Sequence, residues 1–496
     1  MRHCECVDQD FHSRLREISP KGMGLSVDVY SPDLFELVNR LRERGLRPGY
    51  LEIFKATTTA LTKVRRELSD IPLAYHGEGL WITQPDVQAS PFFQQDLDEM
   101  VMQLNSLQSC WLNHECATKQ MAGYSFGTYV PPLYTTVSAQ IVAGNIALVQ
   151  QAMDRRCARA DRTAPLFLLE MPPLTYFVAG TMPIPQFFRL VTASTPCGLV
   201  LDIGHLWTVY RYTAVCRRIP LEQFVREFLD QFPLERVVEI HMAGLACHES
   251  VDEPKEAQGL PEWIDAHAAP IPAVLFAMLE QVLAHPNLVS LRAVALEVDT
   301  KSIELIVQEF AQAVGRFSLL IQKVMDRESP IGQVKEETLR PASVQEPVRQ
   351  TDRQQLRDEY ERYAQIITGQ APTTGPEWQE VAREPGGLTR YRTFYVPHEI
   401  LHWGGDLEGM FPQACLALAE RGVCLTEFVD FWFRSPRPLT HSYDFFLLKI
   451  ERFLEFVAER APDMRISVEQ ECDLLRLAYS QANDLGDSIM EMGRTR

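Results

Sequence analysis

Short apolar runs that end in an acidic residue or a histidine recur through roughly the first three hundred residues of the chain. The clearest is Gly-Leu-Val-Leu-Asp at 198–202, with His205 following closely after Asp202. The apolar residues suit a strand buried on both faces, whereas a charge does not, so each charge is expected at the end of its strand. The other runs end at Asp28, Glu52, His76, Glu115, Glu170, His241 and Glu297.

Segments of helical length separate these eight predicted strands. Parallel neighbours need a crossover of about a dozen residues or more, usually a helix, and every gap in the series can supply one. We therefore predict an α/β fold with a TIM-type (β/α)8 barrel over residues 20–325. The strand C-terminal ends of such a barrel share one face, where the histidines and carboxylates would converge. Because buried acids must be neutralised, we predict a multinuclear metal site there.

The rest of the chain differs in composition from the predicted barrel. Residues 1–19 are expected as a polar N-terminal segment. Residues 326–350 are charged, contain proline and show no apolar period, so we predict a linker. Residues 351–496 show helical periodicity, which predicts an additional, mainly helical C-terminal domain.

Charge and cysteine content limit the classes of function. The formal net charge of −18 and a pI near 5.2 disfavour nucleic acid and anionic membranes as partners. The 11 cysteines form no CxxC pair, which is typical of reduced thiols. The chain has no signal-like start, and no apolar run approaches about 20 residues. These features predict a cytoplasmic protein.

The motifs at the predicted strand ends carry a family resemblance. In order, they are His76-Gly, His114-Glu115, Glu170, Gly198-Leu-Val-Leu-Asp202-x-x-His205, His241-Met-Ala-Gly, Ile264-Asp265-Ala-His267 and Leu296-Glu297-x-Asp299. Together, over about residues 20 to 320, they resemble the multinuclear non-haem iron-dependent oxidative enzymes, or domain-of-unknown-function family 692, which includes the methanobactin biosynthesis oxidase. Imidazole and carboxylate ligands alone would also allow manganese or zinc.

The resemblance implies a TIM-type barrel that holds about two or three iron ions, in mixed Fe2+ and Fe3+ states, with O2 as cosubstrate. It also implies oxidation of a cysteine in a ribosomally made peptide, often with a partner protein that presents the peptide. The ligands it implies are His76, Glu170, Asp202, His241, Asp265, His267 and Glu297.

Several positions depart from the family pattern. Its usual order on the fourth strand is inverted here, which leaves open whether His114 or Glu115 binds metal. His205 stands where the family often has Asn, and we expect it to bind as well. Three acids, Glu52, Glu78 and Asp299, are expected to contact the ligands rather than the metal.

A different motif, His398-Glu399-Ile-Leu-His402, fits the HExxH pattern of zinc proteases. On a helix it would place both histidines on one face, with the glutamate beside a bound water. Pro397 and Gly404 confine that helix to barely two turns, and we expect a chance match rather than a second metal site.

The leading hypothesis is therefore iron- and O2-dependent modification of a peptidyl cysteine, with the C-terminal domain as a fused partner that presents the substrate. One alternative is a divalent-metal hydrolase or isomerase of the endonuclease IV-like or xylose isomerase-like class, which uses similar strand-end ligands. Another is a non-enzymatic peptide-binding scaffold. Metal analysis separates the three hypotheses. Iron is expected for the oxidative enzyme, another divalent metal for the hydrolase or isomerase, and no metal for the scaffold.

Overall fold

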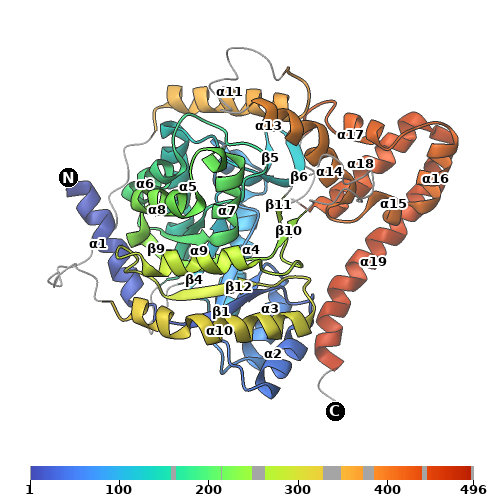
Figure 1. Cartoon of the computed structure of the whole chain (residues 1–496). Coiled ribbons are helices and arrows are strands. Elements are labelled where there is room, and N and C mark those ends of the chain that lie inside the picture. Colours follow the sequence, from blue (N-terminus) through green and yellow to red (C-terminus); the bar gives the residue numbers. More distant parts are fainter. Residues whose placement is uncertain are drawn as a thin grey trace.

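The structure is a computed structural model that describes residues 2–157, 164–213, 215–247, 263–327, 348–372, 385–437 and 444–492. Its centre is a closed barrel of parallel strands in the order β1-β12-β9-β8-β7-β4-β3-β2 (Figure 1). The strands are β1 Gly22–Val27, β2 Leu51–Phe54, β3 Leu73–Gly77, β4 Trp111–Glu115, β7 Leu166–Glu170, β8 Gly198–Asp202, β9 Val237–Met242 and β12 Ala293–Glu297. This confirms the predicted TIM-type barrel and its eight strands.

Amphipathic helices form the outer layer of the barrel. In α2, Asp33 caps the first turn through the amide of Glu36, and Leu34, Leu37 and Leu41 are buried at helical spacing. The helices of this layer are α2 Leu34–Glu43, α3 Thr58–Glu67, α4 Phe93–Leu107, α5 Thr136–Arg156, α6 Ile184–Ser194, α7 Ile203–Tyr212, α8 Leu221–Gln231, α9 Ala273–Ala284 and α10 Ile303–Met325.

The start of the chain forms a helix, α1 Arg2–Arg16, where only a polar segment was expected. Phe11 and Leu15 of α1 are buried in one cluster with Tyr50, Trp111 and other residues of the barrel interior. The apolar positions of this short helix are diluted by charge, so its helical period is weak in the sequence. The helix nevertheless covers the apolar interior of the barrel.

Two hairpins interrupt the barrel sequence. β5 Thr118–Met121 pairs with β6 Tyr124–Val130, and β10 Leu245–Cys247 pairs with β11 Trp263–Asp265. Both pairs are antiparallel and lie outside the barrel sheet. The first hairpin contributes to the pocket above the site, through Lys119 and residues 127–129.

The C-terminal region is helical and packs on the first hairpin (Figure 1). Its helices are α11 Gln350–Ile367, α13 Pro385–Arg390, α14 Val396–His402, α15 Leu407–Met410, α16 Pro412–Glu420, α17 Thr426–Trp432, α18 Phe445–Arg460 and α19 Arg465–Met492, with a π-helical turn at Tyr391–Tyr395. Met121 and Phe126 of the hairpin are buried in the same cluster as the apolar residues of these helices. Trp432 also donates a hydrogen bond to the carbonyl of Ser125 at 2.7 Å.

Most of the predicted linker, residues 328–347, lies outside the described residues. Among the helices that are described, none combines the length and the apolar character needed to cross a bilayer.

Candidate metal centre

Strand register brings the predicted site residues together at the C-terminal end of the barrel. Glu115 of β4 pairs with Glu170 of β7, and Asp202 of β8 pairs with His241 of β9. Helix α7 begins directly after β8, because the Asp202 carboxylate accepts a 2.6 Å hydrogen bond from the amide of His205. His205 therefore enters the site from the first turn of a helix rather than from a strand.

Glu170 and His241 lie at the centre of the cluster. Oε1 of Glu170 is 3.4 Å from Nδ1 of His241, and the same nitrogen is 3.1 Å from Oε1 of Glu297. With Asp202, these residues offer ligand atoms that all lie within 4.8 Å of one another. A second group with the same spacing contains Glu115, Glu170 and His205, so Glu170 belongs to both.

His76 and Asn113 contact the other oxygen of Glu170. Nε2 of His76 lies 3.3 Å from Oε2, and the Asn113 amide donates a 2.7 Å hydrogen bond to that oxygen. Asn113 was not predicted as a site residue. Its only signal in the sequence is a polar side chain inside an apolar strand.

Residues of the β10–β11 hairpin and of β12 complete one side of the cluster. Oδ2 of Asp265 lies 3.2 Å from Nε2 of His205 and 3.4 Å from Nε2 of His267. The same nitrogen of His267 is 3.4 Å from Glu297, while its Nδ1 is 3.1 Å from Asp299. Asp299 thus contacts an imidazole on the side away from the cluster, as expected for an orienting group.

The geometry distinguishes His114 from Glu115. Nε2 of His114 accepts a hydrogen bond from the amide of Leu80 at 3.3 Å, and its Nδ1 is 2.9 Å from the carbonyl of Glu115. Both ring nitrogens are therefore engaged by backbone, so His114 has no nitrogen left for a metal. Glu115, by contrast, contributes a carboxylate to the cluster.

A third group lies on the opposite side of His241 and contains Glu52 and Glu239. Nε2 of His241 is 3.1 Å from Glu52 and 3.4 Å from Glu239. Trp111 donates a 3.0 Å hydrogen bond to Glu52, and the Tyr50 hydroxyl donates to Glu239. Glu239 was not predicted either, although an acid two positions before His241 within a buried strand was a usable signal.

Several buried ligand atoms lack a hydrogen-bond partner. They are Nδ1 of His76, Oε2 of Glu115, Oε1 of Glu170, Oδ2 of Asp202 and Oδ1 of Asp265. Both ring nitrogens of His241 lie 3.1 Å from a carboxylate oxygen but make no hydrogen bond of suitable geometry. Buried polar atoms are normally satisfied, and unmatched imidazole and carboxylate atoms in one place are the donor set that divalent metal ions take. The residues present therefore fit more than one metal ion.

The acids and imidazoles of the cluster perturb one another strongly. Burial, together with the charge of Glu170, raises the pKa of Glu115 well above its ordinary value. Burial alone would lower the pKa of His76, but its hydrogen bond to Glu170 and the charge of Glu52 raise it to about 9. Protons therefore bind these imidazoles tightly in the absence of metal, and metal ions would compete with them.

A pocket of about 370 Å³ opens above the cluster. One wall carries Lys119, whose ammonium forms an ion pair with Glu78 and lies 4.4 Å from the ring centroid of Tyr129. Tyr129 also donates a 3.0 Å hydrogen bond to Glu78. The predicted residue Glu78 thus contacts a lysine rather than the cluster. Burial alone would raise the pKa of Glu78, but the charge of Lys119 lowers it to about 2.

The C-terminal region contributes part of the same pocket through Tyr395, Glu399 and Trp403. Helix α14 lies so close to the hairpin that a Cβ at Gly127 would be 2.7 Å from the carbonyl oxygen of Glu399. The C-terminal domain was expected to present the substrate, but these particular lining residues were not predicted.

The HExxH histidines do not form a group of three ligands. The rings of His398 and His402 are 4.6 Å apart, but Nδ1 of His398 faces Glu399 at 3.1 Å and Nδ1 of His402 faces Asp406 at 2.7 Å. Of the converging ligand groups in the described part of the chain, none includes these histidines. Glu399 instead lines the pocket above the cluster, which we refer to as the metal pocket.

Comparison with known proteins adds a family context. The family model for the RiPP precursor modification enzyme MbnB/TglH/ChrH matches residues 39–316. A UPF0276 protein of Caulobacter vibrioides is 26% identical over 170 residues, which are 34% of this chain and 51% of that protein. A UPF0276 protein of Rhizobium meliloti is 27% identical over 231 residues, 45% of this chain and 63% of that protein. The chain thus spans about half to two thirds of the length of these relatives.

Among solved structures, an endonuclease IV from Thermus thermophilus is 16% identical and aligns over 61% of this chain and 99% of its own, with a TM-score of 0.36. A D-psicose 3-epimerase from Clostridium cellulolyticum is 12% identical and aligns over 60% of this chain and 99% of its own, with a TM-score of 0.35.

Proposed function

The chain belongs to the MbnB/TglH/ChrH family of RiPP precursor modification enzymes, and from this premise we propose that it oxidises a cysteine in a ribosomally made peptide with iron and O2. The observation that carries the proposal is the buried cluster of unmatched carboxylate and imidazole atoms centred on Glu170. Metal ions held by such a cluster, at the bottom of an open pocket, would be accessible to a side chain of a bound substrate.

We assign the metal ligands to His76, Glu115, Glu170, Asp202, His205, His241, Asp265, His267 and Glu297. Glu170 is shared by two of the ligand groups, so it is the candidate bridge between two metal ions. Iron bound by these residues would supply O2 activation and a binding site for the substrate thiolate. The donors contain no thiolate of the protein, which leaves the thiolate position to the substrate.

The protein residues around the ligands have positioning roles. Asp299 would orient His267, and Glu52 would orient His241, each through the ring nitrogen that faces away from the metal. Lys119 contributes a positive charge to a pocket otherwise rich in acids, and Tyr129 and Trp403 limit access of water to it.

The C-terminal region is proposed to contact the peptide substrate and present it to the cluster. Because Tyr395, Glu399 and Trp403 line the pocket that opens on the cluster, a peptide entering this pocket would contact the C-terminal helices. This supports the idea of a fused substrate-presenting unit.

Metal analysis of protein purified anaerobically from iron-supplied cells tests the proposal. We expect about two or three iron ions per chain and Mössbauer signals from both oxidation states. Zinc or manganese without iron would favour a hydrolase or isomerase instead, and absence of any metal would favour a scaffold. O2 uptake should require a cysteine peptide, and the same peptide with serine in place of cysteine should give none.

A further inference from the structure

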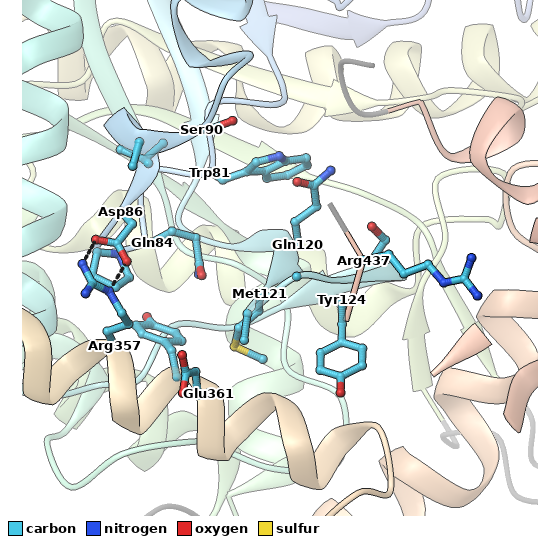
Figure 2. Close-up of a pocket in the computed structure, with 17 residues that line it drawn as sticks. Trp81, Gln84, Asp86, Ser90, Gln120, Met121, Tyr124, Arg357, Glu361 and Arg437 are labelled. Carbon is cyan, nitrogen blue, oxygen red and sulfur yellow. Dashed lines mark hydrogen bonds and ion pairs between the residues drawn. The ribbon is translucent and has the colours of Figure 1, made fainter. Parts of the chain in front are cut away.

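A second pocket of about 370 Å³ lies at the tip of the β5–β6 hairpin (Figure 2). It is lined by residues 120–125 of the hairpin, by Trp81 and the loop that follows it, and by Arg357, Tyr360 and Glu361 of α11. No lining residue is shared with the metal pocket. We refer to it as the hairpin-tip pocket.

The hairpin connects the two pockets. Lys119 and residues 127–129 at its base line the metal pocket, whereas residues 120–125 line the hairpin-tip pocket. A strand rises about 3.3 Å per residue, so Tyr124 at the tip lies about 13 Å along β6 from Thr128 at the base. An extended peptide of a few residues could reach from one pocket to the other.

The hairpin-tip pocket combines apolar surface with an unsatisfied donor. Met121 and Tyr124 provide a buried apolar floor, and Trp81 provides an aromatic wall. Nε2 of Gln120 is buried and has no hydrogen-bond partner, and Figure 2 shows this side chain beside Trp81. A carbonyl oxygen of a bound peptide would accept from this amide.

The charged groups at the rim are largely paired with one another. Arg357 forms an ion pair with Asp86, drawn in Figure 2, and Arg437 forms one with Glu455 at 2.5 Å. A small anion would have to break these pairs to bind either arginine. The pocket is therefore better suited to an apolar peptide segment than to a phosphate or carboxylate ligand.

We propose that the hairpin-tip pocket docks an extended, apolar segment of the peptide substrate and thereby holds its cysteine over the metal pocket. The inference rests on the proposed function, since that function supplies the peptide. It assigns substrate selection to a site remote from the ligands, and it predicts a fixed spacing between the apolar anchor and the modified cysteine.

The test uses fluorescein-labelled synthetic peptides with one leucine and one cysteine, separated by glycine–serine spacers of different length. Binding to the full-length, metal-loaded protein is measured by anisotropy without O2. We expect the tightest binding with a spacer of about three residues, which places the leucine and the cysteine four residue steps, about 13 Å, apart. Gln120→Glu should weaken it about tenfold, because the amide donor becomes an acceptor. Ser90→Trp, at the exposed mouth of the pocket, should weaken it without altering the core.

Gln365→Glu is the matched control, since it makes the same chemical change on an exposed part of α11 outside the pocket lining. Unchanged affinity in both pocket variants, or binding indifferent to spacer length, would overturn the docking site even if the peptides are oxidised. Spacer-dependent binding that Ser90→Trp removes would uphold it even if no peptide supported O2 uptake, in which case the proposed function alone would fail.

Discussion

The ammonium group of Lys119 lies 4.0 Å from the ring centroid of Trp403. Lys119 belongs to the β5–β6 hairpin and Trp403 follows α14, so a cation from the barrel half of the chain is enclosed by an aromatic ring from the C-terminal region. Glu78 and Tyr129 complete the surroundings of the ammonium. The C-terminal region therefore forms part of the pocket above the metal-ligand cluster.

Trp403→Ala should reduce kcat/KM for a cysteine peptide by about tenfold, because a cation–π contact of about 1–2 kcal/mol is lost and the pocket is opened to water. Bound metal should remain, since Trp403 touches no ligand. Phe394→Ala removes another partly exposed aromatic residue of the same region that does not line the pocket. Equal losses in the two variants would show that Trp403 has no special role.

Lys449→Met should loosen the segment that carries Trp403. The Lys449 ammonium donates hydrogen bonds to the carbonyls of Leu401, Trp403 and Gly405 at 3.3, 2.6 and 2.6 Å. Leaving these acceptors unpaired should lower the free energy of unfolding by about 2 kcal/mol.

Hydrogen exchange should then rise in residues 401–405, and denaturant unfolding measures the loss of stability. Lys323→Met, at an exposed position of α10, is the control and should change neither quantity. Unchanged exchange at 401–405 in Lys449→Met would contradict the role of this lysine.

Glu52→Gln tests whether the acid behind His241 supports metal binding. Glu52 is fully buried and lies 3.1 Å from Nε2 of His241, while Nδ1 of that ring faces Glu170 and Glu297. Loss of the charge should weaken metal binding by about 10- to 100-fold, because His241 is no longer oriented and made more basic. Metal titration of chelator-treated protein measures the affinity, and Glu304→Gln at an exposed position is the control.

Much of the barrel was predictable because its signal is local. Each strand is an apolar run that ends in a charge, and the parallel register then places Asp202 beside His241 and Glu115 beside Glu170. The preference for Glu115 over His114 as a candidate metal ligand was not predictable, since it depends on the amide of Leu80, which approaches His114 from another loop.

The upper part of the pocket could not be predicted for a different reason. Lys119 and Glu399 are almost three hundred residues apart. Lys119 lies in no motif, and the HExxH pattern around Glu399 indicates a separate zinc site rather than a contact with the barrel. The hairpin itself has little strand periodicity in the sequence. Its apolar residues Met121 and Phe126 pack against the C-terminal helices rather than in the barrel core. Such contacts become visible only when the tertiary structure is known.

The stability of chelator-treated protein should fall as the pH rises. The pKa of His76 is about 9 in the folded protein, above the value of about 6.5 expected in the unfolded chain. The protonated ring therefore stabilises the fold fully below about pH 6.5, and this contribution is lost as the pH rises through about 9. Burial raises the pKa of Asp202 to about 7, so the stability that its protonated carboxyl contributes is also lost as the pH rises, at lower pH than for His76.

Urea unfolding at several pH values should reveal how stability falls with pH, and His76→Gln should flatten this fall above about pH 7. Metal-loaded protein should lack the fall, because metal ions replace the protons on these groups, and an equal slope in loaded and chelated protein would argue against His76 as a ligand.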